Sequence, residues 1–392
     1  MTKSPLYFFS KWLILILLLS VSIGLSSAVF LVSLNWITQI NLQYDFLIYF
    51  LPIVGLIIGY SYYKWGSSIE KGNKLLIASI ENIDSDKIPF RITPMIFLST
   101  LVTHLFGGSA GREGTALQMA GGITEQISHW FGLSKLEGQS ILIASIAAGF
   151  GAVFGTPLAG TIFALELNKK NALQWYHLVL CFLLAFGAHG VVLLLNVAHT
   201  HYLVSVFPEF SLKNILFISF SAVLFGCCAR LFIYLSNIGS QLFSNIKISY
   251  LRPLVGGILV LLLVKVFDLK DFSGLGIPLI SASFNTQAPY FFFICKILLT
   301  VLTLSSGFKG GEVTPLFFIG ATLGSAMSLF IPLPVALLAA LGFISVFAGA
   351  SKTPIACAIM GVELFGFQGI VFYFIATFVS HFCAGKKGIY GE

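Results

Sequence analysis

The chain has 392 residues, of which 57% are hydrophobic and only 9% are charged. About a quarter of the residues of a typical soluble domain are charged, so this composition excludes an ordinary soluble protein and indicates one that lies in a bilayer. The net charge of +7 would favour a nucleic-acid partner in a soluble protein. In a membrane protein it is explained by orientation charge on cytoplasmic loops, and we expect no nucleic-acid partner. Candidates for this charge are Lys3, Lys11, Lys169, Lys170, Lys386 and Lys387.

Apolar runs recur along the whole chain, and several are near the ~20 residues that cross the hydrocarbon core of a bilayer. Others are shorter or interrupted by Gly and Pro, which predicts half-spanning helices that end inside the protein. The first run is too long for a signal peptide and lacks a clear cleavage site, so we expect a membrane helix there. The runs cover residues 12–37, 46–60, 92–106, 140–167, 176–197, 216–235, 255–267, 291–304, 315–329, 333–348 and 355–382.

The longest polar interval, residues 64–91, follows the first two apolar runs. A solvated loop with one amphipathic helix accounts for this interval at least as well as a binding site does. Gly72 and Asn73 lie where a further helix N-terminus would begin, because glycine permits the tight turn that such an entry needs.

A glutamate flanked by glycines lies in the stretch Gly107-Gly-Ser-Ala-Gly-Arg-Glu-Gly-Thr-Ala116, inside a chain that otherwise avoids charge. A helix is expected after Thr115. A helix N-terminus attracts anions, because its first amides lack partners and carry the positive end of the dipole. The carboxylate of Glu113 would occupy such a site as a tethered anion and leave it on protonation. Alternatively, Arg112 and Glu113 form a polar turn at the membrane surface, and the motif alone fits both interpretations.

Two landmarks of the first half recur in the second half in the same order, which indicates an internal duplication. We place the repeat halves at residues 11–200 and 211–385. In membrane transporters such halves are often inverted about an axis in the membrane plane, with the substrate at their interface. The duplication therefore predicts that Glu113 and Glu312 approach one central site from opposite halves. A shift of 199 residues lays Gly111, Glu113, Thr115, Leu117 and Gly121 on Gly310, Glu312, Thr314, Leu316 and Gly320, and a shift of 197 lays Thr156, Pro157 and Glu166 on Thr353, Pro354 and Glu363.

Carboxylates in a membrane interior are costly, so Glu113 and Glu312 must find donors or take up protons. An anion that enters only when a glutamate is protonated and moves away is exchanged against a proton. Thr314 offers a hydroxyl donor to a small, strongly hydrated anion, and a threonine bonded to its own helix backbone fits equally well. Tyr390 offers a phenol donor within a pore, with an interfacial tyrosine as the alternative.

Other kinds of chemistry lack their sequence signatures. There is no His-Glu-x-x-His, the six cysteines lack metal-like spacing, and no Gly-Lys-Ser/Thr follows a Gly-rich loop. We therefore expect no metal, no cofactor and no enzymatic activity. An intramembrane hydrolase or transferase that uses Glu113 and Glu312 as an acid/base pair is kept as a distant alternative.

The stretch Gly111-Arg-Glu-Gly-Thr115 resembles the Gly-x-Glu-Gly-Pro motif of the CLC family of chloride channels and proton-coupled anion antiporters. The stretch Gly311-Glu-Val-Thr-Pro315 stands where that family has Gly-x-Phe-x-Pro. The repeat and the segment Gly155-Thr-Pro-Leu-Ala-Gly160 agree, so the resemblance covers nearly the whole chain. In this family the motif glutamate is the gate, and that role falls on Glu113.

Both departures from the chloride motifs look like the fluoride-exporting branch of the family, whose members read Gly-Arg-Glu-Gly-Thr and Gly-Gly-Glu-Val-Thr-Pro. This likeness implies a central anion and proton relay for Glu312 and Thr314, and an anion-facing phenol for Tyr390. Fluoride exporters have Gly-Asn at the first helix terminus, which Gly72 and Asn73 resemble, without the methionine and phenylalanine lining. The family also implies a homodimer with a separate pore in each subunit.

The expected fold is an all-α integral membrane protein, a CLC-like inverted internal repeat of many tilted and half-spanning helices. It has one transport domain, residues 1–392, and no soluble regulatory domain. We expect a proton-coupled antiporter that exports fluoride across a bacterial inner (plasma) membrane; a chloride-preferring antiporter and an uncoupled anion channel are alternatives. Beside the gate Glu113 and the relay residues Glu312 and Thr314, the expected pathway residues are Gly111, Arg112, Gly114, Thr115, Asn73 and Tyr390.

Overall fold

The computed structural model describes residues 5–82, 87–168 and 174–391 of the chain. Three of the lysines to which orientation charge was assigned, Lys3, Lys169 and Lys170, lie outside these described residues. Within them the chain forms sixteen α-helices, five short 3-10 helices and no strand. The expected all-helical fold is therefore confirmed.

Eight α-helices precede residue 200, and eight follow residue 211. The first set is α1 (Pro5–Gln43), α2 (Leu51–Trp65), α3 (Asn73–Glu81), α4 (Ile92–Leu105), α5 (Glu113–Trp130), α6 (Lys135–Phe154), α7 (Pro157–Leu167) and α8 (Trp175–Leu194). The second set is α9 (Leu212–Ser244), α10 (Arg252–Val266), α11 (Ile277–Asn285), α12 (Phe292–Ser305), α13 (Val313–Met327), α14 (Val335–Ser351), α15 (Pro354–Phe365) and α16 (Ile370–Cys383). The 3-10 helices are Asp45–Phe50, Ser67–Ile69, Ser249–Leu251, Lys270–Phe272 and Phe367–Gly369.

The two sets of helices agree with the internal duplication. Helices α2 and α10 have 15 residues each, α3 and α11 have 9, and α4 and α12 have 14. The match extends to backbone angles, since Thr156 precedes α7 with φ −126° and ψ 72°, and Thr353 precedes α15 with φ −125° and ψ 68°. Both helices then begin at a proline, whose fixed φ suits the first helical position.

Six helical stretches among the described residues are long and apolar enough to cross a membrane. Helices α4, α7, and α12 to α15 are apolar but have only 11 to 17 residues. These shorter helices agree with the expectation of half-spanning segments, because a helix needs about 20 residues to cross the hydrocarbon core.

Two of the predicted apolar runs are each divided into two helices. The run 140–167 breaks between α6 and α7, where Gly155 takes a left-handed conformation with φ 76° and Pro157 starts the next helix. The run 355–382 breaks between α15 and α16, where Gly366 has φ 97°. Hydropathy alone cannot show these breaks, because both turns are made by residues that do not interrupt the apolar pattern.

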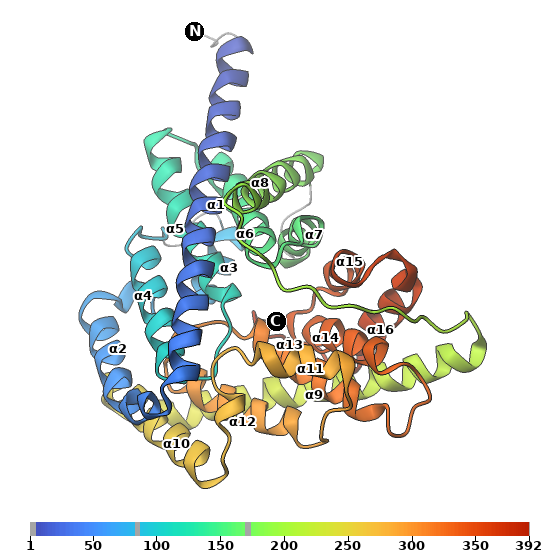
Figure 1. Ribbon diagram of the computed structural model, residues 1–392. Helices are drawn as coiled ribbons and strands as arrows, with labels where there is room; N and C mark the ends of the chain where they lie inside the picture. The colour runs from blue at the N-terminus through green and yellow to red at the C-terminus, as the bar shows by residue number, and fades with distance from the viewer. Residues whose placement is uncertain (1–4, 83–86, 169–173, 392) are drawn as a thin grey trace. The chain divides into compact units, whose positions relative to one another are not determined.

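The chain divides into two compact units, and three of the five boundaries fall within α1, α4 and α5. Unit 1 comprises residues 1–33, 71–97 and 116–199, and in it α6 packs against α7 and α8. Unit 2 comprises residues 34–70, 98–115 and 200–392, and in it α14 packs against α13, α16 and α9 (Figure 1). The close packing of α13 on α14 depends on two glycines, since a Cβ on Gly320 would lie 2.0 Å from the carbonyl oxygen of Gly342.

Candidate functional site

A pair of backbone hydrogen bonds joins the two glycine-rich motifs within unit 2. The N–H of Gly111 donates to the carbonyl of Gly311 at 2.6 Å, and the N–H of Gly311 donates to the carbonyl of Gly111 at 2.8 Å. Both positions need glycine, because a Cβ on Gly311 would lie 2.6 Å from the backbone nitrogen of Gly114. Glu113 comes two residues after Gly111, and Glu312 comes directly after Gly311. Both glutamates therefore lie close along the chain to this pair of backbone hydrogen bonds.

The carboxylate of Glu113 lies at the N-terminus of α13. One carboxylate oxygen accepts from the hydroxyl of Thr314 at 2.5 Å, and the other accepts from the backbone N–H of Thr314 at 3.1 Å. The backbone N–H of Arg112 donates to that second oxygen at 3.1 Å. The first amides of a helix have no partner within the helix, so this carboxylate takes the position that an anion would take.

Burial distinguishes between the two interpretations of Glu113. Its side chain is fully buried, and that of Thr314 is 5% exposed. A polar turn at the membrane surface is therefore wrong for Glu113, because that interpretation needs a solvated carboxylate. The expected N-terminus also needs a correction, since α5 begins at Glu113 and not after Thr115, and the helix whose amide and hydroxyl hold the carboxylate is α13 of the second half.

Arg112 pairs with the carboxylate from its side. Its Nε lies 3.5 Å from Oε1 of Glu113, and its side chain is 17% exposed. The guanidinium thus reduces the cost of a buried carboxylate without enclosing it completely. Arg112 and Glu113 are paired, as the surface-turn interpretation also allowed, but the pair lies in the interior.

Glu312 occupies the N-cap position of α13, directly before Val313. A negative charge is favourable there because the positive end of the helix dipole faces it. The hydroxyl oxygen of Tyr390 is buried, and the charged groups that act on it electrostatically include Glu312 and Glu113. Tyr390 therefore lies within electrostatic range of the two glutamates.

The expected pathway residue Thr115 has a partner on α4. Its hydroxyl and that of Thr100 lie 2.7 Å apart, and both side chains are fully buried. One turn further along α4, the ring of His104 contacts the carbonyl of Thr100 at 2.8 Å and that of Ala110 at 3.0 Å. His104 thereby fixes the loop that enters the Gly111 motif, a role that the sequence analysis missed.

A second missed contact supports the other glycine motif. Lys309 lies directly before Gly310, and its Nζ is 4.0 Å from the centre of the Tyr62 ring. The hydroxyls of Tyr62 and Ser99 lie 3.4 Å apart. A cation over an aromatic face is attracted by the ring quadrupole, so this contact ties the loop before Glu312 to α2. The signal for it in the sequence was a lysine inside a glycine loop.

Asn73 belongs to unit 1 and is the first residue of α3. Its side-chain oxygen accepts a hydrogen bond of 3.1 Å from the amide of Gln118, which is 4% exposed. Gly72 has φ 52°, and a Cβ there would lie 3.2 Å from the same amide nitrogen. Gln118 was not identified from the sequence, although it lies only five residues after Glu113 on α5.

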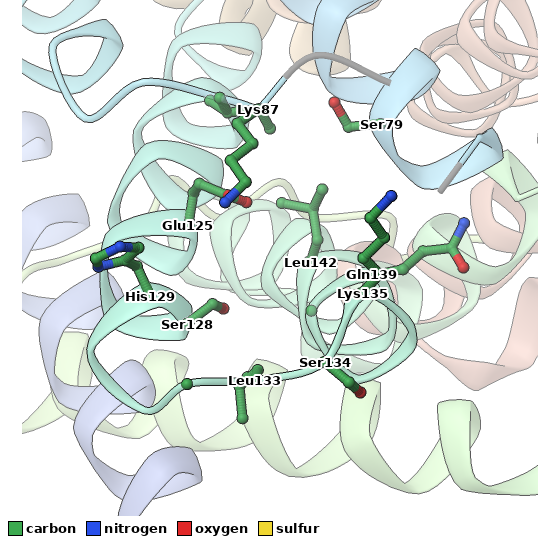
Figure 2. Close-up of a pocket in the computed structure, with 13 residues that line it drawn as sticks. Ser79, Lys87, Glu125, Ser128, His129, Leu133, Ser134, Lys135, Gln139 and Leu142 are labelled. Atoms are coloured by element: carbon green, nitrogen blue, oxygen red, sulfur yellow. The ribbon is translucent and has the colours of Figure 1, made fainter. Parts of the chain in front are cut away.

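A cavity of about 480 Å³ lies in unit 1 where α3 and α5 end and α6 begins. Figure 2 shows the side chains of Lys87 and Glu125 pointing toward one another at its edge. None of the residues that were predicted from the sequence lines this cavity. Among the described residues, no group of three His, Cys, Asp or Glu side chains is placed to hold a metal ion.

The comparisons with known proteins agree with the fold. The family model described as voltage gated chloride channel matches residues 54–385. A chloride/fluoride channel protein of Pseudomonas syringae pv. tomato is 39% identical over 391 residues, which cover 98% of this chain and 86% of that protein. The chain therefore belongs to the voltage gated chloride channel family, the CLC family of anion transporters and channels.

Solved structures give the same result. The crystal structure of a CLC-type fluoride/proton antiporter matches with a TM-score of 0.94 and 32% identity, covering 99% of this chain and 98% of the other. A slow cyanobacterial Cl⁻/H⁺ antiporter has the same fold, with a TM-score of 0.85 at 18% identity over 97% of this chain and 96% of the other. The expected CLC fold is confirmed.

Proposed function

We propose that this CLC protein is an antiporter that exports fluoride in exchange for protons. The carrying observation is the carboxylate of Glu113 at the N-terminus of α13, where the hydroxyl and backbone N–H of Thr314 hold it. A carboxylate in that position excludes an anion. Its protonation removes the charge that the helix terminus attracts, so the side chain leaves and an anion enters. Each anion then moves against a proton that Glu113 has taken up.

The donors around this position suit a small, strongly hydrated anion. Fluoride gives up its water only for short and strong hydrogen bonds, and the 2.5 Å contact made by the hydroxyl of Thr314 is of that kind. Glu312 at the N-cap of α13 and the buried hydroxyl of Tyr390 complete the group. In the proposed cycle, Glu312 passes the proton and Tyr390 donates to the passing anion.

The names of two relatives support fluoride as the substrate. One is the chloride/fluoride channel protein of Pseudomonas syringae, and the other is the CLC-type fluoride/proton antiporter. We extend the proposal to a homodimer with one pathway in each subunit, in the inner membrane of a bacterium. Six long apolar helical stretches support a multi-pass membrane protein.

Purified protein in liposomes tests the proposal. Vesicles are loaded with fluoride or with chloride, and anion release is followed with ion-selective electrodes while the external pH is recorded. We expect faster release of fluoride than of chloride, with protons moving into the vesicles. Equal or faster chloride release would favour a chloride-preferring antiporter, and fluoride release without proton movement would favour an uncoupled channel. Hydrolysis or group transfer without ion flux would favour the intramembrane enzyme.

A further inference from the structure

We propose that Lys352 is a positioning residue for the anion pathway, whose ammonium group holds the C-terminal segment that carries Tyr390 in place. This inference rests on the proposed role of Tyr390 as a donor to the anion. The internal duplication aligns Thr156 and Pro157 with Thr353 and Pro354, and no function has been assigned to this repeated segment. Lys352 directly precedes that segment, at the end of α14 in unit 2.

The backbone of Lys352 is in the left-handed helical region, with φ 66° and ψ 33°. This region is unfavourable for a residue with a Cβ and is normally occupied by glycine. The equivalent position of the first repeat half is occupied by Gly155, with φ 76° and ψ 23°. The same turn is therefore made by glycine in one half and by lysine in the other. This difference indicates that the side chain of Lys352 has a function that offsets its unfavourable backbone conformation.

The ammonium group of Lys352 is bound to the last turn of α16 and to the segment directly after it. Its Nζ donates to the carbonyl of Gly385 at 2.6 Å and lies 3.4 Å from that of His381. The last carbonyls of a helix have no N–H partner within the helix, and a cation there is also favoured by the dipole. The side chain is only 6% exposed, so solvent competes little for these bonds.

The segment after α16 is bound to the same corner through its backbone. The N–H of Ile389 donates to the carbonyl of Ala350 at 2.9 Å. A Cβ on Gly388 would lie 2.9 Å from Cγ of Lys352 and 3.1 Å from the oxygen of Ala350. The two residues before Tyr390 therefore lie directly against the end of α14, and the shaft of Lys352 is part of the surface they contact.

Tyr390 connects this corner to the candidate site. Its hydroxyl is buried, and both Glu312 and Glu113 act on it electrostatically. The phenol has no helix of its own to orient it, because α16 ends at Cys383. The chain directly before it is held by the contacts of Gly388 and Ile389 with Ala350 and Lys352. We expect loss of the ammonium group to displace the phenol of Tyr390, although no residue that is proposed to contact the anion is itself substituted.

Three substitutions of Lys352 separate the parts of this role. Lys352→Met removes the donors and keeps most of the apolar shaft, whereas Lys352→Arg keeps the donors. Lys352→Gly introduces the residue of the first repeat half, so it relaxes the backbone while it removes the side chain. Lys386→Met is a matched control, because this exposed lysine lies in the same segment and its loss changes the net charge equally.

The experiment compares these variants with Tyr390→Phe and with the double variant Lys352→Met/Tyr390→Phe in liposomes. We expect Lys352→Met and Lys352→Gly to lower the fluoride to chloride flux ratio by about tenfold, in the same direction as Tyr390→Phe. We expect Lys352→Arg and Lys386→Met to match the wild type. The double variant is expected to match Tyr390→Phe alone, since a residue that acts only through Tyr390 has no further effect once the phenol is gone.

A second measurement does not depend on transport. When 3-fluorotyrosine replaces tyrosine in the protein, the ¹⁹F resonance of residue 390 is identified as the one that is lost in Tyr390→Phe. We expect this resonance to shift in Lys352→Met and to keep its wild-type position in Lys352→Arg. An unchanged resonance in Lys352→Met together with a wild-type flux ratio would overturn the inference. It would also be overturned if the double variant lowered the flux ratio by the product of the two single effects. A wild type that prefers chloride would instead contradict the proposed function, while the coupling between Lys352 and Tyr390 would still be measured by chloride flux and by the resonance.

Discussion

The carboxylate of Glu113 accepts two hydrogen bonds from one residue, Thr314, whose hydroxyl lies at 2.5 Å and whose backbone N–H lies at 3.1 Å. These residues come from different repeat halves and meet because the Gly111 and Gly311 motifs pair through their backbones. A threonine at the first turn of α13 thus offers two donors to whatever negative group occupies that place. In the structure the occupant is Glu113.

Replacement of Thr314 tests the hydroxyl donor. Thr314→Val keeps the shape of the side chain but removes the hydrogen bond to a charged group, which is worth about 1.5–3 kcal/mol. We expect fluoride turnover in liposomes to fall by about tenfold or more, with a larger loss for fluoride than for chloride. Thr314→Ser keeps the donor and is expected to retain most of the turnover. Wild-type selectivity in Thr314→Val would contradict a role for the hydroxyl.

Packing of α13 on α14 is tested by Gly320→Ala. A Cβ on Gly320 would lie 2.0 Å from the carbonyl oxygen of Gly342, which belongs to the backbone of α14 and cannot rotate away. Overpacking of this kind costs about 1–3 kcal/mol, so we expect a lower thermal midpoint in detergent. Gly190→Ala in α8 is the matched control, because nothing lies within 4 Å of its Cβ. Equal midpoints for the two variants would contradict the close approach.

The pair formed by Gln118 and Asn73 predicts an effect on anion affinity. Gln118→Leu removes the 3.1 Å hydrogen bond that orients the amide of Asn73, and we expect the concentration for half-maximal fluoride flux to rise about fivefold. Gln139→Leu is the control, since Gln139 donates to the carbonyl of Ile80 at the other end of α3. This control should change stability only. Equal shifts in both variants would mean that α3 responds as a whole and that Asn73 has no special part.

The cavity in Figure 2 gives a prediction on pH. Burial raises the pKa of Glu125 above its ordinary value of 4.5, while Lys87 and His129 act in the opposite direction. A carboxyl with a raised pKa in the folded state stabilises the fold below its unfolded pKa and loses that contribution as the pH rises through the folded pKa. The thermal midpoint of Glu125→Gln should therefore exceed that of the wild type increasingly above pH 4.5. A difference that shrinks with rising pH would contradict this sign.

That the two glycine motifs are related was predictable from the sequence for a clear physical reason. Glycine motifs at a constant offset indicated two copies of one unit, and charged residues inside apolar sequence rarely lie apart from one another. The structure pairs Gly111 with Gly311, and Glu113 and Glu312 follow these glycines by two residues and by one; that the two glutamates share one central site stays a prediction. Their roles in transport stay predictions, as do the boundaries of the repeat halves.

Contacts between residues distant in the sequence were not predictable. The pairing of Lys352 with the carbonyl of Gly385, and the contact of Lys309 with Tyr62, depend on which helix ends meet in space. A hydropathy pattern carries no such information. Interruption of some runs by Gly and Pro was expected, but the breaks at Gly155 and Gly366 were not located, because a left-handed turn in an apolar run leaves the composition of that run unchanged.

The account depends on protonation of Glu113, and Glu113→Gln tests it most directly, since glutamine has the shape of the protonated acid and cannot release a proton. Purified wild type and variant are reconstituted side by side, an outward fluoride gradient is imposed, and internal pH is followed with a trapped dye. The account predicts that the gradient drives protons inward in the wild type, and that no fluoride-coupled proton movement occurs in the variant. Proton uptake by Glu113→Gln at the wild-type rate and stoichiometry would contradict it.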